Sequence, residues 1–302
     1  MIYSWLIVII LAYLFFAFSS FGDKLVLAGR PKPKSYIFYV GAFGLFVVLF
    51  IPFIKFGLPT GAGLTWIILD ALVRIAGLYA MYEALERFDV SKVMVTIGAT
   101  QPIFIFALTW LFGKGAIMPA SDILAFLILF LACIIVSVEK TPKITGDYLK
   151  ITLFSSIMFS LDYVFTKMVF LNQPFLQGVI WTGIFIFIFV SILLFSKSSR
   201  KEIFAKSMVL DKGVQAKFIL AQACGGAANF LQSFAIFLVP VVFLPIVNSL
   251  RGIQYAFLFI ITLFISIFFP KVLKEGLSKR IILQKVISII LIVIGLAILV
   301  IY

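Results

Sequence analysis

Long apolar runs separated by short polar connectors fill this sequence from one end to the other. Each run has about 20 residues, which is enough for a helix to cross the roughly 30 Å hydrocarbon core of a bilayer. The runs are continuous, whereas the strands of a membrane barrel alternate apolar and polar residues, so the pattern indicates helices. We predict ten transmembrane spans, at 3–22, 36–54, 64–85, 91–112, 122–138, 149–170, 175–195, 216–238, 241–268 and 282–301.

Composition agrees with this prediction and argues against a soluble protein. Hydrophobic residues make up 64% of the 302 positions and charged residues only 12%, with a mean hydropathy of +1.22. Soluble domains average about 25% charged residues, so this chain lacks the polar residues that a soluble surface needs. The longest connector, around 196–215, is too short to hold a soluble catalytic domain. The expected fold class is therefore an all-α integral membrane protein.

Basic residues are concentrated in alternate connectors, those that follow spans one, three, five, seven and nine. These connectors and the adjoining helix ends hold twenty of the 25 basic residues, whereas the opposite set holds only Lys55, Lys114 and Lys167. By the positive-inside rule the first set is cytoplasmic, which places both termini outside a plasma (inner) membrane that the chain crosses several times. The same rule accounts for the net charge of +13 without a nucleic-acid partner.

Residue types that hold metals or carry out catalysis are scarce. The chain has no His, and Cys133 and Cys224 lie inside predicted spans without a spaced partner, so neither a metal site nor a disulfide is predicted. The sequence contains no ATP-binding loop of the Gly-rich type. We therefore expect no cofactor and no catalytic residue, and we expect any transport to draw on an ion gradient or on the solute itself.

Local self-similarity indicates two related halves. Residues 24–27 (KLVL) resemble 167–170 (KMVF), and the stretch 84–102 aligns with 235–253. Each half holds five predicted spans, an odd number, so the second half enters the membrane from the opposite side. The expected arrangement is two inverted five-helix repeats, from which alternating access follows when the halves exchange conformations.

Three short motifs carry a resemblance to a known family. The first span ends in Ser20-Phe21-Gly22-Asp23-Lys24, the fourth contains Gln101-Pro102-Ile103-Phe104, and Lys274-Glu275-Gly276-Leu277-Ser278 precedes a last span with Gln284-Lys285 and Gly295. With them the chain resembles the drug/metabolite transporter superfamily, specifically its EamA-type ten-helix members, over nearly its whole length. The resemblance implies two EamA-like repeats, 1–146 and 147–302, and a cavity surrounded by helices one, three, four, six, eight and nine.

The chain departs from the family pattern in two motifs and in its orientation. Gly113-Lys114-Gly115 replaces the acidic turn in the first half, and span nine has Ile253 where a proline is common. Family members are described with both termini in the cytosol, opposite to the orientation that the basic residues predict here. We take the orientation from the basic residues, because they belong to this sequence itself.

Four ionisable residues fall inside predicted spans, where a charge is costly and marks a candidate functional site. Asp70 and Arg74 lie four residues apart on one helical face, so they could neutralise each other. Asp162 and Arg251 have no charged neighbour in their own spans. Asp162 therefore needs a partner from another helix, from water or from substrate, and a pair with Arg251 is one alternative. Asp70 and Asp162 are the candidates for proton or ion coupling.

Polar side chains also recur at spacings of three and four, so that each set lies on one helical face. The small residues of these stripes are expected to hold helices together, and the larger ones to line a water-filled central cavity. The predicted substrate-binding residues are Arg74, Gln101, Asp162, Tyr163, Asn229, Gln232, Asn248, Arg251 and Gln254. Arg251 would hold a carboxylate or phosphate, and Asp162 an amine or a proton.

A further charged group lies at the end of the third span. It consists of Glu83, Glu86, Arg87, Asp89 and Lys92. We expect a solvated turn there, with a gate as the alternative.

Together these features favour a secondary active transporter that moves a small polar or amphipathic metabolite, such as an amino acid or related zwitterion, by alternating access. The expected partners are this small molecule, the lipid bilayer and a proton as coupling ion, in a monomer or a homodimer. Two alternatives stay open. One is a non-transporting membrane scaffold or helper subunit, whose interior charges are structural ion pairs. The other is a membrane-embedded lipid-modifying enzyme, for which the required acid–base cluster is missing from the sequence.

Overall fold

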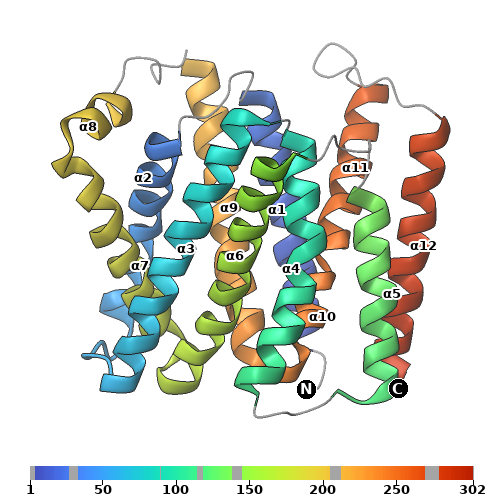
Figure 1. Cartoon of the computed structure of the whole chain (residues 1–302), viewed down its shortest axis with the longest axis horizontal. Helices are drawn as coiled ribbons and strands as arrows, with labels where there is room; N and C mark the ends of the chain where they lie inside the picture. Colours follow the sequence, from blue (N-terminus) through green and yellow to red (C-terminus); the bar gives the residue numbers. More distant parts are fainter. Residues whose placement is uncertain are drawn as a thin grey trace. The chain divides into compact units, whose positions relative to one another are not determined.

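The computed structural model describes residues 4–26, 33–88, 90–113, 118–137, 145–204, 212–268 and 279–301. Within these residues all regular structure is helical and no strand occurs (Figure 1). This agrees with the continuous apolar runs, since a helix satisfies its own backbone hydrogen bonds inside lipid. Lys114 and the turn 274–278, which entered the family comparison above, lie outside the described residues, as does Asp89.

Seven helices of the described chain are long and apolar enough to cross a membrane, so the protein is membrane-embedded. They are Ser4–Gly22, Gly61–Arg87, Gly146–Asn172, Phe175–Phe195, Ile219–Leu238, Val241–Phe268 and Ile282–Ile301. The other three predicted spans coincide with the shorter apolar helices Ile37–Phe53, Thr96–Phe112 and Ala120–Val136. The all-helical membrane class is thus confirmed, while the count of ten spans stays a prediction.

The chain divides into two compact units. Unit 1 holds Met1–Ala28, Gly98–Lys143 and Ala216–Tyr302, and unit 2 holds Gly29–Ile97 and Ile144–Gln215. Each unit takes segments from both of the predicted halves, and one helix, α4 (Val90–Phe112), belongs partly to each. Packing and internal repetition are different properties of a chain, so the division into repeats 1–146 and 147–302 stays a prediction.

Unit 2 is built around a helix pair. Its elements, besides the first turns of α4, are α2 (Pro33–Gly44), the 3₁₀ helix η1 (Leu45–Phe53), α3 (Gly61–Arg87), α6 (Gly146–Asn172), α7 (Phe175–Ser191), the 3₁₀ helix η2 (Ile192–Phe195) and α8 (Lys197–Ile203). Helices α2 and α7 lie side by side, and α7 also packs on α3 (Figure 1). Helix α6 is the most buried candidate span, with 61% of its most apolar window buried against 22–33% for the others.

Helices α3 and α6 run in opposite directions and approach closely. A methyl group added to Gly63 would collide with Gln173, and one added to Gly77 would press against Phe159. Ser155 strengthens the contact, because its hydroxyl donates to the carbonyl of Gly77 at 2.9 Å. Small residues allow such close approach in membrane helix pairs. This register decides which polar residues of the two helices meet.

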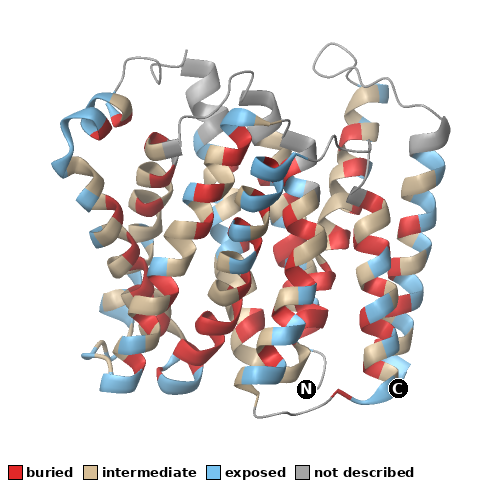
Figure 2. Cartoon of the chain, viewed as in Figure 1, coloured by how far each residue is buried: buried red, intermediate tan, exposed pale blue. Residues whose placement is uncertain are grey.

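Unit 1 contains the remaining helices. They are α1 (Ser4–Val26), α4 from Gly98 on, α5 (Ala120–Ser137), α9 (Lys212–Leu238) from Ala216 on, the 3₁₀ helix η4 (Val241–Phe243), α10 (Leu244–Ser249), α11 (Arg251–Phe268) and α12 (Lys279–Ile301). Helices α5 and α12 pack closely, since a methyl group on Gly295 would collide with Leu129. The faces of α5 and α12 that lie away from this contact are exposed (Figure 2), and their exposed residues are largely apolar, as expected of helices that face lipid.

The ninth predicted span, 241–268, is interrupted. Helix α10 ends at Ser249, Leu250 forms a turn, and α11 begins at Arg251. The N–H of Ile253 bonds the carbonyl of Leu250 three residues back, at 2.9 Å, which is the tighter 3₁₀ pattern. All residues from Leu244 to Leu250 are buried. The sequence predicted one continuous span here, and the interruption places Arg251 at a point where the backbone departs from regular α geometry.

Candidate functional site

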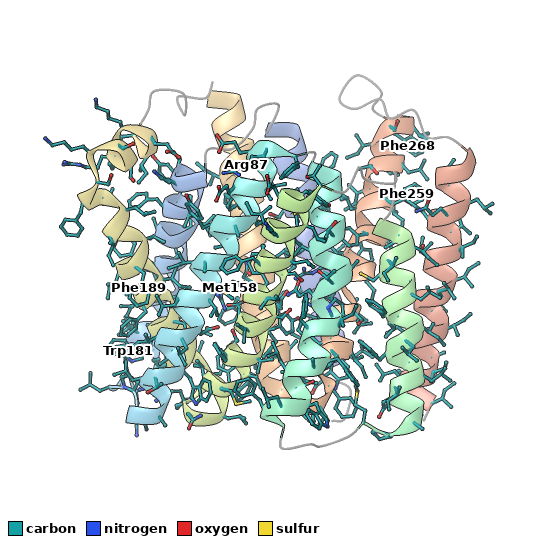
Figure 3. All side chains as sticks on the ribbon, in the orientation of Figure 1. Arg87, Met158, Trp181, Phe189, Phe259 and Phe268 are labelled. Carbon is teal, nitrogen blue, oxygen red and sulfur yellow. The ribbon has the colours of Figure 1, made fainter. Side chains whose placement is uncertain are left out.

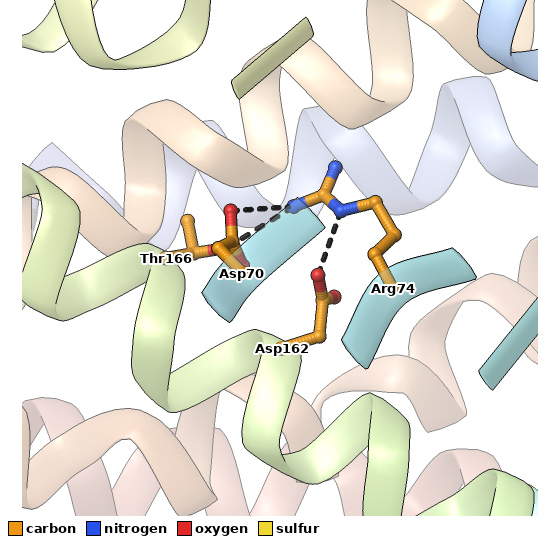
Figure 4. Close-up of polar contacts among 4 residues, drawn as sticks. All are labelled: Asp70, Arg74, Asp162 and Thr166. Atoms are coloured by element: carbon orange, nitrogen blue, oxygen red, sulfur yellow. Dashed lines mark hydrogen bonds and ion pairs between the residues drawn. The ribbon is translucent and has the colours of Figure 1, made fainter. Parts of the chain in front are cut away.

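The first polar cluster lies on α3 and α6 and consists of Asp70, Arg74, Asp162 and Thr166, called here the α3–α6 cluster (Figure 4). The guanidinium of Arg74 donates from Nε to Asp162 Oδ1 at 2.7 Å and from Nη2 to the hydroxyl of Thr166 at 3.1 Å. Its Nη2 also lies 3.6 Å from Asp70 Oδ2. One arginine therefore joins carboxylates from two different helices.

Thr166 completes the α3–α6 cluster. Its hydroxyl accepts from Arg74 and donates to Asp70 Oδ1 at 2.9 Å, so it links the two residues of α3 from the side of α6. The side chain of Asp70 is 1% exposed, that of Asp162 15% and that of Arg74 25%. Within this cluster two carboxyl groups meet one guanidinium. The two carboxyl groups therefore outnumber the one permanently charged cation, and the cluster can take up a proton or another cation.

The structure decides between the alternatives that the sequence left open for these charges. The expected Asp70–Arg74 contact within one helix is present, though at 3.6 Å it is longer than the bond to α6. Asp162 takes its partner from another helix, as expected, and that partner is Arg74. Asp162 and Arg251 belong to different units, and the alternative pair between them stays a prediction. Spacing within one helix does not reveal the register of its neighbour, which is why the sequence could not choose.

Lys167 is an interior charge that falls inside the predicted span 149–170 but was counted with the helix ends of one connector set and not among the candidate site residues. It lies within α6, and only 5% of the residue is exposed. Five positions separate it from Asp162, so the two side chains lie on different faces of the helix. A signal was present in the sequence: the apolar run continues past Lys167 to Phe170, so the lysine is still inside the span.

The second polar cluster surrounds the interruption between α10 and α11 and consists of Gln101, Asn248 and Arg251, called here the α10–α11 cluster. Arg251 donates from Nη1 to Gln101 Oε1 at 2.8 Å, which ties α11 to α4. Gln101 and Asn248 are each 1% exposed. Asn248 and Arg251 lie three positions apart with helical backbone between them, so they share a face. All three were predicted as substrate-binding residues, and the structure brings the Arg251–Gln101 pair together.

The amide nitrogen of Asn248 has no hydrogen-bond partner in the structure although it is buried. A buried donor without a partner costs free energy, about 1–3 kcal/mol, and most native proteins avoid it. Arg251, three positions further along the chain, donates to Gln101 Oε1. The α10–α11 cluster thus holds a buried donor without a partner, which suits an incoming acceptor such as a carboxylate.

Two neighbouring polar residues extend this region along α11. Gln254 donates from Nε2 to the hydroxyl of Ser20 on α1 at 3.2 Å. The hydroxyl of Tyr255 lies 3.2 Å from the position that a Cβ on Gly98 of α4 would take, so only a glycine leaves it room. Gln254 was a predicted binding residue, and in this structure its amide joins two helices of unit 1.

The remaining predicted binding residues are placed differently. Asn229 on α9 is exposed and donates to the carbonyl of Gly225 in its own helix at 2.9 Å. Gln232, one turn further, has a buried Oε1 without a hydrogen-bond partner. Tyr163 follows Asp162 in α6 and is 1% exposed. The substrate-binding roles of these three residues stay predictions.

Small residues also behave as helix contacts in unit 1. A methyl group added to Gly22 of α1 would collide with Ala221 of α9, and one added to Gly225 would lie 2.9 Å from the hydroxyl oxygen of Ser19. The expectation that small polar residues hold helices together is therefore met at Ser155 in unit 2 and at these glycines in unit 1.

Comparison with known proteins gives a fold likeness and no family. No family model matches the sequence, and no curated protein matches it. A solved structure described as "Crystal structure of protein" is similar, with a TM-score of 0.69 and 12% sequence identity over 99% of this chain and 96% of that chain. At this identity the likeness shows the fold alone, and it extends over nearly the whole of both chains.

Proposed function

We propose that this protein is a secondary active transporter of the drug/metabolite type, which moves a small polar metabolite across a membrane by alternating access. The observation that carries the proposal is the α10–α11 cluster. An arginine and a buried, unpartnered amide donor lie on one face at an interruption in a candidate membrane span. Polar groups at membrane depth are expensive, and irregular helices near the midplane are where transporters bind their substrates.

The unpartnered amide donor of Asn248, near an arginine in the sequence, suggests the chemistry of the substrate. Arg251 and Asn248 together offer N–H groups to a carboxylate, and a guanidinium binds a carboxylate through two parallel hydrogen bonds. An amino acid or a related zwitterion carries such a group. In this proposal Gln101 holds the guanidinium in place before the substrate arrives, through the 2.8 Å bond to Arg251.

The α3–α6 cluster has the opposite character and takes the coupling role in the proposal. Its two carboxyl groups share one arginine, and a proton added to Asp70 or Asp162 would balance the charge. Proton relays in pumps and transporters use acidic groups of this kind. The candidate coupling residues remain those of the sequence analysis, Asp70 and Asp162, and Arg74 is assigned to this cluster rather than to the substrate.

Uptake by purified protein in liposomes tests the proposal. Amino acids, amines, nucleosides and phosphorylated metabolites would be offered with and without a proton gradient, to the wild type and to Arg251→Ala and Asp162→Asn. We expect transport of a carboxylate-bearing solute, a loss of uptake in Arg251→Ala at any gradient, and a loss of gradient dependence in Asp162→Asn. Absence of uptake and counterflow for the whole panel would favour the scaffold alternative. Transport that both variants leave unchanged would refute the site assignment.

Orientation needs a separate experiment. Twenty of 25 basic residues lie in one set of connectors, which we propose to be cytoplasmic, with both termini outside the plasma membrane. Lys197 begins α8 within this set and is exposed. In a background where Cys133 and Cys224 are replaced by Ala, a Lys197→Cys variant should resist a membrane-impermeant maleimide in intact cells and react after lysis. Reaction in intact cells would reverse the orientation.

A further inference from the structure

A charged pocket lies at one end of unit 2, where the start of α2, the end of α3 and helix α8 come together. Its volume is about 460 Å³, within the usual range for small-molecule sites. It is lined by Lys34, Tyr79, Glu83, Glu86, Arg87, Ser198, Lys201 and Glu202. Figure 3 shows Arg87 at the end of α3 and long side chains with nitrogen tips projecting from α8. These segments belong to three of the basic connectors, which the sequence predicts on one side of the membrane.

Three hydrogen bonds join α2 to the end of α8 beside the pocket. The backbone N–H of Lys34 donates to Glu202 Oε1 at 3.2 Å, and the hydroxyl of Ser35 donates to the backbone carbonyl of Glu202 at 2.7 Å. The hydroxyl of Tyr39 donates to the carbonyl of Ile203 at 3.3 Å. Since α8 has only seven residues, these bonds rather than its own helical structure fix its place on α2.

The lining holds three acidic and three basic side chains, which differ in how they are paired. Arg87 forms an ion pair with Glu83 one turn earlier in α3. Glu202 is engaged by the N–H of Lys34. The ammonium groups of Lys34 and Lys201 form no ion pair with a carboxylate among the described residues. They come from two different elements, so the fold rather than the local sequence brings two positive charges to one pocket.

We propose that this pocket binds an anionic group, a phosphate or a carboxylate, between Lys34 and Lys201. The hydroxyls of Tyr79 and Ser198 line the same space and are able to donate to it. Basic pockets at membrane surfaces attract anionic headgroups, and soluble organic anions offer the same chemistry. Phe195, 86% exposed, lies two residues before the start of α8 and suits the interfacial depth of a lipid headgroup. The site is separate from both polar clusters, and the proposal does not depend on transport.

Binding is tested in nanodiscs with two probes that distinguish the sources. In phosphatidylcholine nanodiscs, inorganic phosphate is titrated and followed by microscale thermophoresis. In mixed phosphatidylcholine and phosphatidylglycerol nanodiscs, retained phosphatidylglycerol is counted by native mass spectrometry. The variants are Lys34→Gln, Lys201→Gln and Glu202→Gln. The matched control is Lys55→Gln, which removes the same charge from an exposed position beyond the other end of α3.

We expect Lys34→Gln and Lys201→Gln to weaken binding about tenfold, as for a lost charge-assisted hydrogen bond, and Lys55→Gln to leave it unchanged. Glu202→Gln keeps an oxygen that accepts from Lys34 and removes a negative charge, so it should bind about threefold more tightly. If the two lysine variants bind phosphate more weakly, the site is assigned to soluble anions. If they lose only the bound phosphatidylglycerol, the site is assigned to lipid. Lysine variants that match Lys55→Gln with both probes, while all remain folded, would overturn the proposal.

Discussion

The α3–α6 cluster and the α10–α11 cluster both place an arginine inside apolar helices, and the two arginines meet opposite surroundings. Arg74 meets two carboxylates and a hydroxyl, with Asp162 at 2.7 Å and Asp70 at 3.6 Å. Arg251 meets a neutral amide oxygen, that of Gln101, and shares its helical face with the unpartnered nitrogen of Asn248. The first cluster has more carboxylates than permanent positive charges, and the second holds a buried donor without a partner.

The difference distinguishes a cluster that stabilises helix packing from a cluster that is available to bind a ligand. A guanidinium that bridges two helices contributes to their register, and removing it leaves buried charges without a partner. The amide nitrogen of Asn248, buried and without a partner, keeps its donors available. Arginine thus serves packing in unit 2 and, in our proposal, recognition in unit 1. Four substitutions test this contrast, from the largest expected effect on stability to the smallest.

Arg74→Ala should have the largest effect on stability. It leaves Asp70, 1% exposed, and Asp162 without their positive partner, and breaking a buried pair in this way costs about 3–5 kcal/mol. The free energy of unfolding, measured by denaturant titration in mixed micelles, should fall by that amount. Adding Asp70→Asn and Asp162→Asn should recover most of the loss, because no unpaired carboxylate is then left. If the single variant loses less than about 1 kcal/mol, the cluster does not hold the helices together.

Arg251→Ala should destabilise less, by about 2 kcal/mol, because it breaks one hydrogen bond of a charged donor and leaves no charge behind. Its uptake should fall by more than about tenfold, the factor that corresponds to about 1.4 kcal/mol of lost binding. Liposome uptake and unfolding would be measured on the same preparations. Arg251→Lys is the control, since it keeps the charge and loses the planar fork. A stability loss as large as that of Arg74→Ala would remove the contrast between the clusters.

Ser155→Ala should cost about 0.6 kcal/mol, the average for a hydrogen bond between membrane helices. Its hydroxyl crosses from α6 to the carbonyl of Gly77 on α3. Ser288 on α12 provides a matched control, because it is equally buried and donates to the carbonyl of Gln284 in its own helix. Ser288→Ala should therefore leave the free energy of unfolding nearly unchanged. Equal effects of the two variants would mean that the bond to Gly77 adds nothing to the contact between the helices.

Asn248→Leu should be the least destabilising of the four changes and should not lower the free energy of unfolding. Leucine has a similar size, and the amide nitrogen that it removes has no hydrogen-bond partner to lose. Uptake should nevertheless fall, because the nitrogen is assigned to the substrate. A large loss of stability with unchanged uptake would show that Asn248 serves packing, and the α10–α11 cluster would then resemble the α3–α6 cluster.

Much of the architecture was predictable from the sequence, because hydrophobic length acts locally. Each apolar run is long enough to cross the bilayer, and a helix satisfies its own backbone hydrogen bonds in lipid. Helical spans and their approximate bounds follow from these two facts. The interruption at Leu250 was not predicted, although Gly252 follows it by two residues. Lys167 was counted with the helix ends because it stands near the end of its predicted span, and α6 continues past it to Asn172.

The candidate site was predictable as a list of residues and not as a set of pairs. A charge inside an apolar run is visible in one dimension, which is how Asp70, Arg74, Asp162 and Arg251 were found. Their partners depend on the register of neighbouring helices. That register depends on close approach at positions such as Gly77, which the sequence analysis did not include.

The sequence by itself therefore determined that the chain is helical and membrane-embedded, and that a few charges must stay within apolar helices. Both follow from the transfer free energy of each residue, which does not need a neighbour. Only the tertiary structure decided that Arg74 joins Asp162, that Arg251 joins Gln101, and that Asn248 has a donor left over. Hydrogen bonds depend on ångström distances between helices distant in the chain, and packing alone sets those distances.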